Sequence, residues 1–125
     1  MSGADEIYAL ATNFGKASAK VASTLFDVYD QSGEAFADDW RSNAAATSGA
    51  HGKHYPASID HEMKLSFGIS VEIGPNSAKK QGRMGRGFEL GSRNQPAHLD
   101  GTRALGQAEA RLAKAADVAI GFLAP

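Results

Sequence analysis

Hydrophobic residues recur every three or four positions through the first third of the chain, which is the spacing of one helix face. The residues that share this spacing are Ile7, Leu10, Phe14, Ala17, Val21, Thr24 and Val28. The turn-forming sequence Asp30-Gln31-Ser32-Gly33 then predicts a break. A second helical stretch follows, with Phe36 and Trp40 four residues apart on one side. Residues 1–48 are therefore predicted to be a helical region.

The pattern changes to strict alternation after a short connector. Residues 49–57 have no packing period and contain glycines and a proline, which predicts a flexible connector. In the segment 58–74, the alternating hydrophobic side, with one histidine, consists of Ile59, His61, Met63, Leu65, Phe67, Ile69, Val71 and Ile73. Alternation predicts half-buried strands, and its length favours an antiparallel β-hairpin that turns near residues 66–68. A single bent strand would show the same alternation.

The last part of the chain combines a glycine-rich loop with a long helix. Residues 75–98 are predicted to form a basic glycine-rich loop, with room for one helical turn at 86–90. Residues 99–123 are predicted to form the C-terminal helix, because Leu105, Ala108, Leu112, Ala115, Ala119 and Phe122 repeat at helical spacing. The small residues on the first and last helices predict that these helices pack on each other or on neighbouring subunits. Helices at the ends and strands in the middle indicate a single α+β domain spanning residues 1–125.

Composition and charge exclude several classes of protein. The 125 residues include no cysteine, which excludes disulfides, thiolate metal sites and a cysteine nucleophile. The apolar runs are too short to span a membrane, so we expect no membrane partner. The net charge of −1 conceals an asymmetry, since residues 1–40 hold seven acids against two lysines and residues 79–93 hold five cations against one glutamate. Opposite poles can steer a chain onto a charged partner or onto its own copies, or they can simply be solvated.

Motifs for catalysis or cofactor binding are weak. The histidines lie in a connector, on the apolar side of a strand, or far from the others (His51, His54, His61 and His98), which does not favour a metal site. The glycine spacing in Gly82-Arg83-Met84-Gly85-Arg86-Gly87 is neither a dinucleotide fingerprint nor a phosphate-binding loop. Asp38 and Asp39 are adjacent, so on a helix they point about 100° apart, which is poor geometry for shared acid–base work. We therefore predict a non-enzyme without a cofactor. An enzyme using His54 or His61 is the remaining catalytic alternative.

A run of motifs between residues 70 and 105 resembles a family of phage structural proteins. The run comprises Ser-Val-Glu-Ile-Gly-Pro at 70–75, Gln-Gly-Arg-Met-Gly-Arg-Gly at 81–87, Phe-Glu-Leu-Gly-Ser at 88–92 and Asn-Gln-Pro-Ala-His at 94–98, followed by a helix near Thr102. It is similar to the tail-completion proteins of the siphovirus neck, also described as minor tail components. The helix and connector that precede the hairpin also match the layout of that family.

The resemblance implies a virion protein of the head–tail junction, assembled in the host cytoplasm. It further implies six- or twelve-fold rings around the DNA path, in contact with connector, terminator or tail-tube proteins. A tail terminator and a small non-specific DNA-binding module using residues 79–93 are the alternatives. The candidate contacts with DNA or with an acidic neighbouring surface are Lys79, Lys80, Arg83, Arg86 and Arg93, and the candidate subunit-packing residues are Phe36, Trp40 and Phe88.

Overall fold

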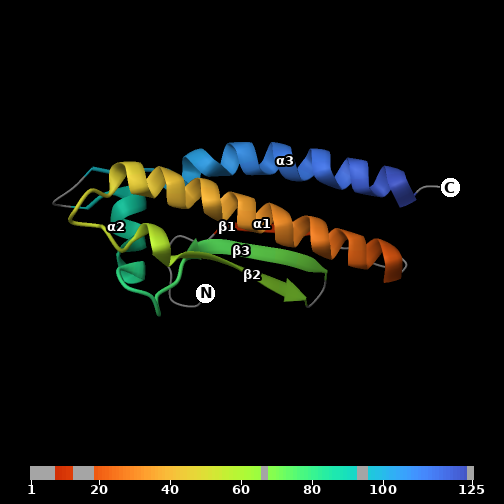
Figure 1. Ribbon diagram of the computed structural model, residues 1–125, viewed down its shortest axis with the longest axis horizontal. Coiled ribbons are helices and arrows are strands. Elements are labelled where there is room, and N and C mark those ends of the chain that lie inside the picture. The colour runs from red at the N-terminus through yellow and green to blue at the C-terminus, as the bar shows by residue number, and fades with distance from the viewer. Residues whose placement is uncertain (1–7, 13–18, 66–67, 93–95, 124–125) are drawn as a thin grey trace.

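The computed structural model describes residues 8–12, 19–65, 68–92 and 96–123. The elements in chain order are β1 (Tyr8–Thr12), α1 (Ala19–Thr47), the 3₁₀ turn η1 (Pro56–Ser58), β2 (Ile59–Leu65), β3 (Ile69–Pro75), the 3₁₀ turn η2 (Gly82–Met84), α2 (Gly85–Leu90) and α3 (Asp100–Leu123). Figure 1 shows an elongated molecule in which α1 lies between the sheet and α3, with α2 at one end. The predicted α+β class is confirmed.

The sheet is antiparallel, with the strand order β1-β3-β2. Its centre is β3, whose Ile69, Val71 and Ile73 are at most 1% exposed. These three residues are paired with Leu65, Met63 and His61 of β2, so the alternating side chains of the two strands share the face covered by α1. The predicted hairpin is confirmed, and the alternative of one bent strand is wrong.

The prediction of a helix at the start of the chain is wrong for residues 8–12. This segment is β1, and it pairs with β3 from Tyr8 opposite Ile73 to Thr12 opposite Ile69. Its sequence Tyr-Ala-Leu-Ala-Thr is too short for helical and strand periods to be separated, so backbone hydrogen bonds to β3 decide its conformation. Of the other residues in the predicted helical pattern, Ile7, Phe14 and Ala17 lie outside the described residues.

The predicted helix break at Asp30–Gly33 is also wrong, because α1 runs without interruption from Ala19 to Thr47. Gly33 lies within this helix, where it faces the sheet and allows close packing. A Cβ atom at Gly33 would lie only 2.5 Å from Cγ2 of Val71, so the missing side chain lets α1 approach the middle of the sheet. Burial of the apolar face of α1 against the sheet offsets the roughly 1 kcal/mol by which glycine weakens a helix relative to alanine.

The long helices α1 and α3 pack on each other, which is the first of the two predicted arrangements, the other being packing on neighbouring subunits. Ala108 and Leu112 of the predicted seam are buried. At the start of α3, a Cβ atom at Gly101 would lie 2.7 Å from the Trp40 ring, so glycine allows this close approach. None of the described helices has both the length and the hydropathy needed to cross a membrane.

Candidate functional site

The first turn of α3 is capped by a buried carboxylate from α2. The side chain of Glu89 is fully buried, and its Oε1 accepts a 2.8 Å hydrogen bond from the N–H of Gly101. Its Oε2 accepts hydrogen bonds from the Thr102 N–H at 2.8 Å and from the Thr102 hydroxyl at 2.6 Å. The N–H groups of a first helical turn have no partners within the helix and carry the positive end of its dipole. Glu89 accepts hydrogen bonds from two of these N–H groups and places its negative charge at the positive end of the dipole. The sequence predicted no role for Glu89, although it is the one acid within residues 79–93.

A second buried carboxylate joins α3 to the end of α1. Asp100 is fully buried, and the hydroxyl oxygen of Thr47 lies 2.9 Å from each of its carboxylate oxygens. Arg103 donates to the same carboxylate at 2.7 Å, and the Asn43 amide donates to the backbone carbonyl of Asp100 at 2.9 Å. Together with Glu89, these contacts fix how α1, α2 and α3 meet at one end of the molecule.

An aromatic stack fastens the connector to α2. The rings of Tyr55 and Phe88 are stacked with centroids 4.4 Å apart, and the His98 ring lies 5.8 Å from Phe88. The N–H groups of His98 and Leu99 donate to the carbonyls of Phe88 and Glu89. The motif residues 88–92 and 96–102 therefore form one structural unit around the buried Phe88 ring.

The three residues predicted to pack between subunits lie in the core of the single chain. Phe36 and Trp40 are 0% exposed and Phe88 is 1% exposed, so a neighbouring subunit could not reach them. Their expected role at a subunit interface is corrected to core packing. The ring centroids of Phe36 and Trp40 are 6.0 Å apart, which is a normal contact within a hydrophobic core.

Hydrogen bonds hold the loop between β3 and η2 against the connector. Gln81 has a left-handed backbone conformation with φ of 62°, and its side chain bridges two connector residues. Its Oε1 accepts from the His54 N–H at 2.7 Å, and its Nε2 donates to the His51 carbonyl at 2.9 Å. The connector was predicted to be flexible, but these bonds and the stack on Tyr55 hold it against α2 and the loop.

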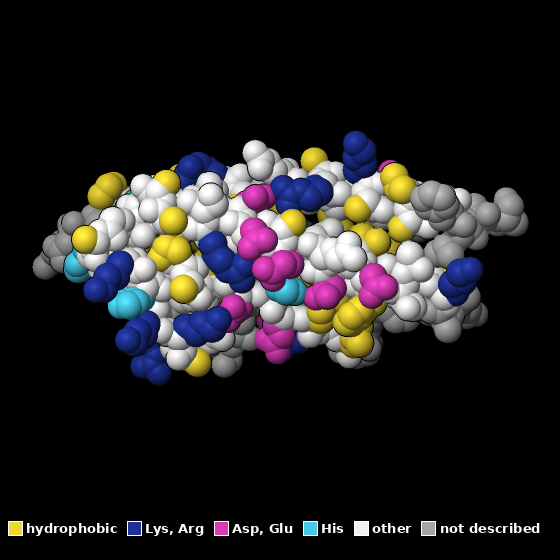
Figure 2. All heavy atoms as spheres, viewed as in Figure 1, with side chains coloured by type: hydrophobic (Ala, Val, Ile, Leu, Met, Phe, Trp, Pro, Cys, Tyr) yellow, Lys and Arg dark blue, Asp and Glu magenta, His cyan; other side chains and the backbone are white. Residues whose placement is uncertain are grey.

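This framework presents a group of cations at one end of the molecule, which we call the basic end: Lys53, Lys80, Arg83 and Arg86. All four are exposed, and none of them forms an ion pair with another described residue. Figure 2 shows Lys, Arg and His side chains gathered at the end where α2 lies, while Asp and Glu run along the middle. The sequence did not point to Lys53 because it is 27 to 33 residues from the others, and the Gln81 bridge brings its segment to them.

The remaining predicted cations do not belong to this group. Lys79 is engaged within the chain, since its Nζ lies 2.9 Å from Oδ1 of Asp60 on β2. Arg93 lies outside the described residues. The structure therefore brings together Lys80, Arg83 and Arg86 of the predicted set.

Four of the seven acids predicted within residues 1–40 join two acids of β2 in a band of carboxylates, which we call the acidic band: Asp27, Asp30, Glu34, Asp38, Asp60 and Glu62. Asp39 instead pairs with Arg111 of α3 at 2.7 Å, and Asp5 and Glu6 lie outside the described residues. His61 of β2 reaches into the band, with Nε2 at 2.8 Å from Asp30 and Nδ1 at 2.8 Å from Glu34. These contacts fasten β2 to α1. His61 was predicted to lie on the apolar side of its strand, and it does face α1, but its ring is held by carboxylates.

Arg41 and Lys79 offset part of the negative charge of the acidic band. Arg41 lies 3.0 Å from Glu34 and 2.7 Å from Asp38, and its Nε donates to the Ile59 carbonyl. Partial burial would raise the pKa of Asp60. Hydrogen bonds from Lys79 and Asn76, together with the charges of Lys79 and Arg41, outweigh that effect and hold its pKa below the ordinary value.

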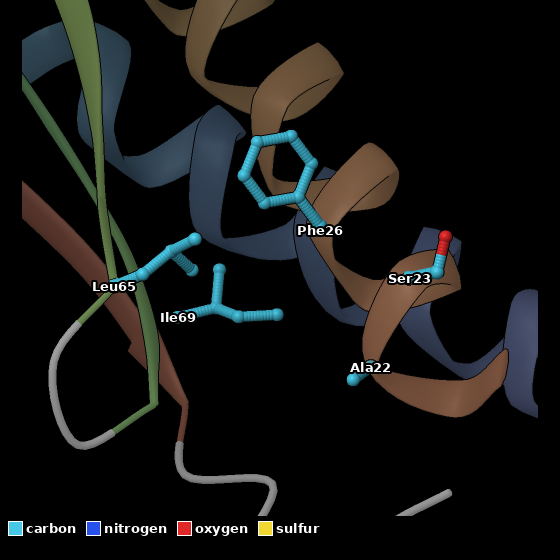
Figure 3. A pocket seen from close by; sticks show the side chains of 5 residues that line it. All are labelled: Ala22, Ser23, Phe26, Leu65 and Ile69. Carbon is cyan, nitrogen blue, oxygen red and sulfur yellow. The ribbon is translucent and has the colours of Figure 1, made fainter. Parts of the chain in front are cut away.

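Surface hollows lined by described residues flank α1 on two sides. An apolar hollow of about 280 Å³ is lined by Ala22, Ser23, Phe26, Leu65 and Ile69. Figure 3 shows Phe26 on α1 facing Leu65 and Ile69 on the hairpin. A polar hollow of about 320 Å³ between α1 and α3 is lined by Asp39, Ser42, Asn43, Arg103 and Gln107.

The histidines are not assembled into a common site. His51 and His54 are exposed on the connector, His98 packs on Phe88, and His61 is held by the acidic band. Within the described ranges, no His, Asp and Glu side chains are grouped in a way that could hold a metal ion. No protein-family model matches the chain, and no curated protein or solved structure shows significant similarity to it.

Proposed function

We propose that the protein is a structural subunit of the head–tail junction of a long-tailed phage and acts there in tail completion. The observation that carries the proposal is the run of motifs at 70–105, which resembles the tail-completion proteins. The residues of this run are used to build the fold. Glu89 caps α3, Phe88 stacks on Tyr55, and Asp100 ties α3 to α1. A motif devoted to packing and capping is what a subunit with a fixed shape requires.

The proposal assigns the basic end to contacts outside the chain. Its cations stand on a framework fixed by the Gln81 bridge and the Phe88 stack, so they would bind an anionic partner with little further loss of backbone entropy. Charged groups of this kind direct encounter and orientation more than they add affinity. Charge reversal at the basic end should therefore slow or misdirect assembly while the fold remains intact.

The position of the gene and the composition of the particle test this proposal. We expect the neighbouring genes to encode a head–tail connector and a tail-tube protein, and mass spectrometry of purified virions to detect the chain. Disruption of the gene should yield separate heads and tails in electron micrographs, with tails of normal length. Tails of uneven length would instead indicate a terminator. A metabolic operon around the gene, or infectious particles without the chain, would contradict the proposal.

A pair of matched variants tests the role of the basic end. In complementation of the disrupted gene, Arg83→Glu/Arg86→Glu should reduce the number of joined particles at least tenfold. The control Lys20→Glu/Lys114→Glu makes the same change in net charge at exposed positions away from the basic end and should complement normally. Equal complementation by the two variants would remove the basic end from the assembly contact. Circular dichroism of both purified variants checks that the fold is unchanged.

A further inference from the structure

We infer that the basic end binds the phosphate backbone of double-stranded DNA without sequence preference. The inference goes beyond the proposed structural role, because it assigns a ligand to this surface. It rests on three properties of the described residues: unpaired cations on a fixed framework, an acidic band in which five of six carboxylates already face a basic side chain of the same chain, and aromatic rings that are buried.

The cations of the basic end can bind an anion without breaking an existing contact. Lys53, Lys80, Arg83 and Arg86 are exposed and form no ion pair within the described part of the chain. Lys79 shows the contrast, since binding an outside anion would require it to leave Asp60.

The acidic band of a second copy is a poor match for this surface. Five of its six carboxylates lie within ion-pair distance of a basic side chain of their own chain, namely His61, Arg41, Lys79 or Lys64. Arg83 or Arg86 of a second copy would therefore meet carboxylates whose negative charge is already partly offset within their own chain. DNA offers closely spaced phosphates whose mobile counterions are released when cations replace them. The charge pattern therefore favours a polyanion over self-docking.

The contact is with phosphates and not with bases. The aromatic side chains nearest to the basic end, Tyr55 and Phe88, are at most 1% exposed and cannot stack on bases. Gln81, the amide in this region, is held by the backbone of His51 and His54. Within the described residues, this surface has no exposed aromatic ring and no free amide for base contacts, and cations that bind phosphates add affinity without reading sequence.

The test is fluorescence anisotropy with a labelled 20-base-pair duplex of random sequence and the full chain, over a salt series from 50 to 200 mM. Four phosphate contacts predict a slope of about −3.6 for log affinity against log salt, which is about a 150-fold loss of affinity over that range. Arg83→Gln/Arg86→Gln should halve the slope and weaken binding at least tenfold at 50 mM salt. The control Lys20→Gln/Lys114→Gln should stay within twofold of the unaltered chain.

Three outcomes would overturn the inference. The first is no measurable binding at 50 mM salt. The second is an equal loss of DNA affinity in the two double variants, which would mean that binding depends on the overall charge of the chain and not on a defined surface. The third is displacement of the duplex by polyglutamate at an equal or lower concentration of negative charge, which would identify an acidic protein surface as the better ligand. Any of these leaves the proposed structural role to be decided by the composition of the virion and the gene-disruption phenotype.

Discussion

Replacement of Glu89 by glutamine tests whether the buried carboxylate holds α3 in place. Glu89→Gln keeps the shape of the side chain but replaces one acceptor oxygen by an NH₂ group. If the remaining oxygen stays with Thr102, the buried N–H of Gly101 faces a donor and loses its partner. A buried donor left unsatisfied costs about 1–3 kcal/mol, so we expect the free energy of unfolding to fall by about 2 kcal/mol.

Urea unfolding, followed by circular dichroism at a fixed protein concentration, measures this loss. With a slope of about 1–3 kcal/mol per molar urea for a small domain, the midpoint should move down by about 1 M. Glu109→Gln is the matched control, because Glu109 is exposed on α3, and its midpoint should change little. A loss for Glu89→Gln below about 0.5 kcal/mol, the range of an ordinary surface substitution, would refute the capping argument.

Two further predictions concern packing and charge. Gly101→Ala should lower stability by about 1–3 kcal/mol through overpacking against Trp40 and change the fluorescence of this single tryptophan. Gly106→Ala on the same helix, with nothing within 4 Å of the added methyl, should raise the melting temperature slightly. Because the folded-state pKa of Asp60 is lowered, the stability it contributes is present above its unfolded pKa and is lost as the pH falls through its folded pKa. Asp60→Asn should therefore lose less stability than the unaltered chain between pH 5 and pH 2, and identical acid-unfolding curves would contradict this.

The hairpin and the last helix could be predicted because their patterns are long. Alternation from Ile59 to Ile73 covers two full strands, and the helical spacing after residue 99 covers several turns. The segment 8–12 is too short for a period to be distinguished, so its partner β3 determines its conformation. The break predicted at Gly33 is wrong for a similar reason. The close packing of Gly33 against Val71, a residue 38 positions away, keeps this glycine within a continuous helix.

The candidate site was predictable in its charge but not in its construction. Lys80, Arg83 and Arg86 were recognised because they are close in sequence. Lys53 joins them through the Gln81 bridge, and Lys79 leaves them because Asp60 lies beside it. Both changes depend on contacts between segments that are distant in the chain, which no local pattern records.

By itself, the sequence determined the α+β class, the strand alternation and the presence of a cationic segment, because these follow from local spacing and composition. Only the tertiary structure decided which charges are neutralised and which remain available. It turned the acidic pole into an internally paired band, buried Trp40 and Phe88, and made Glu89 the cap of α3. The physical reason is that ion pairing and burial depend on distances across the fold, whereas periodicity depends only on neighbours along the chain.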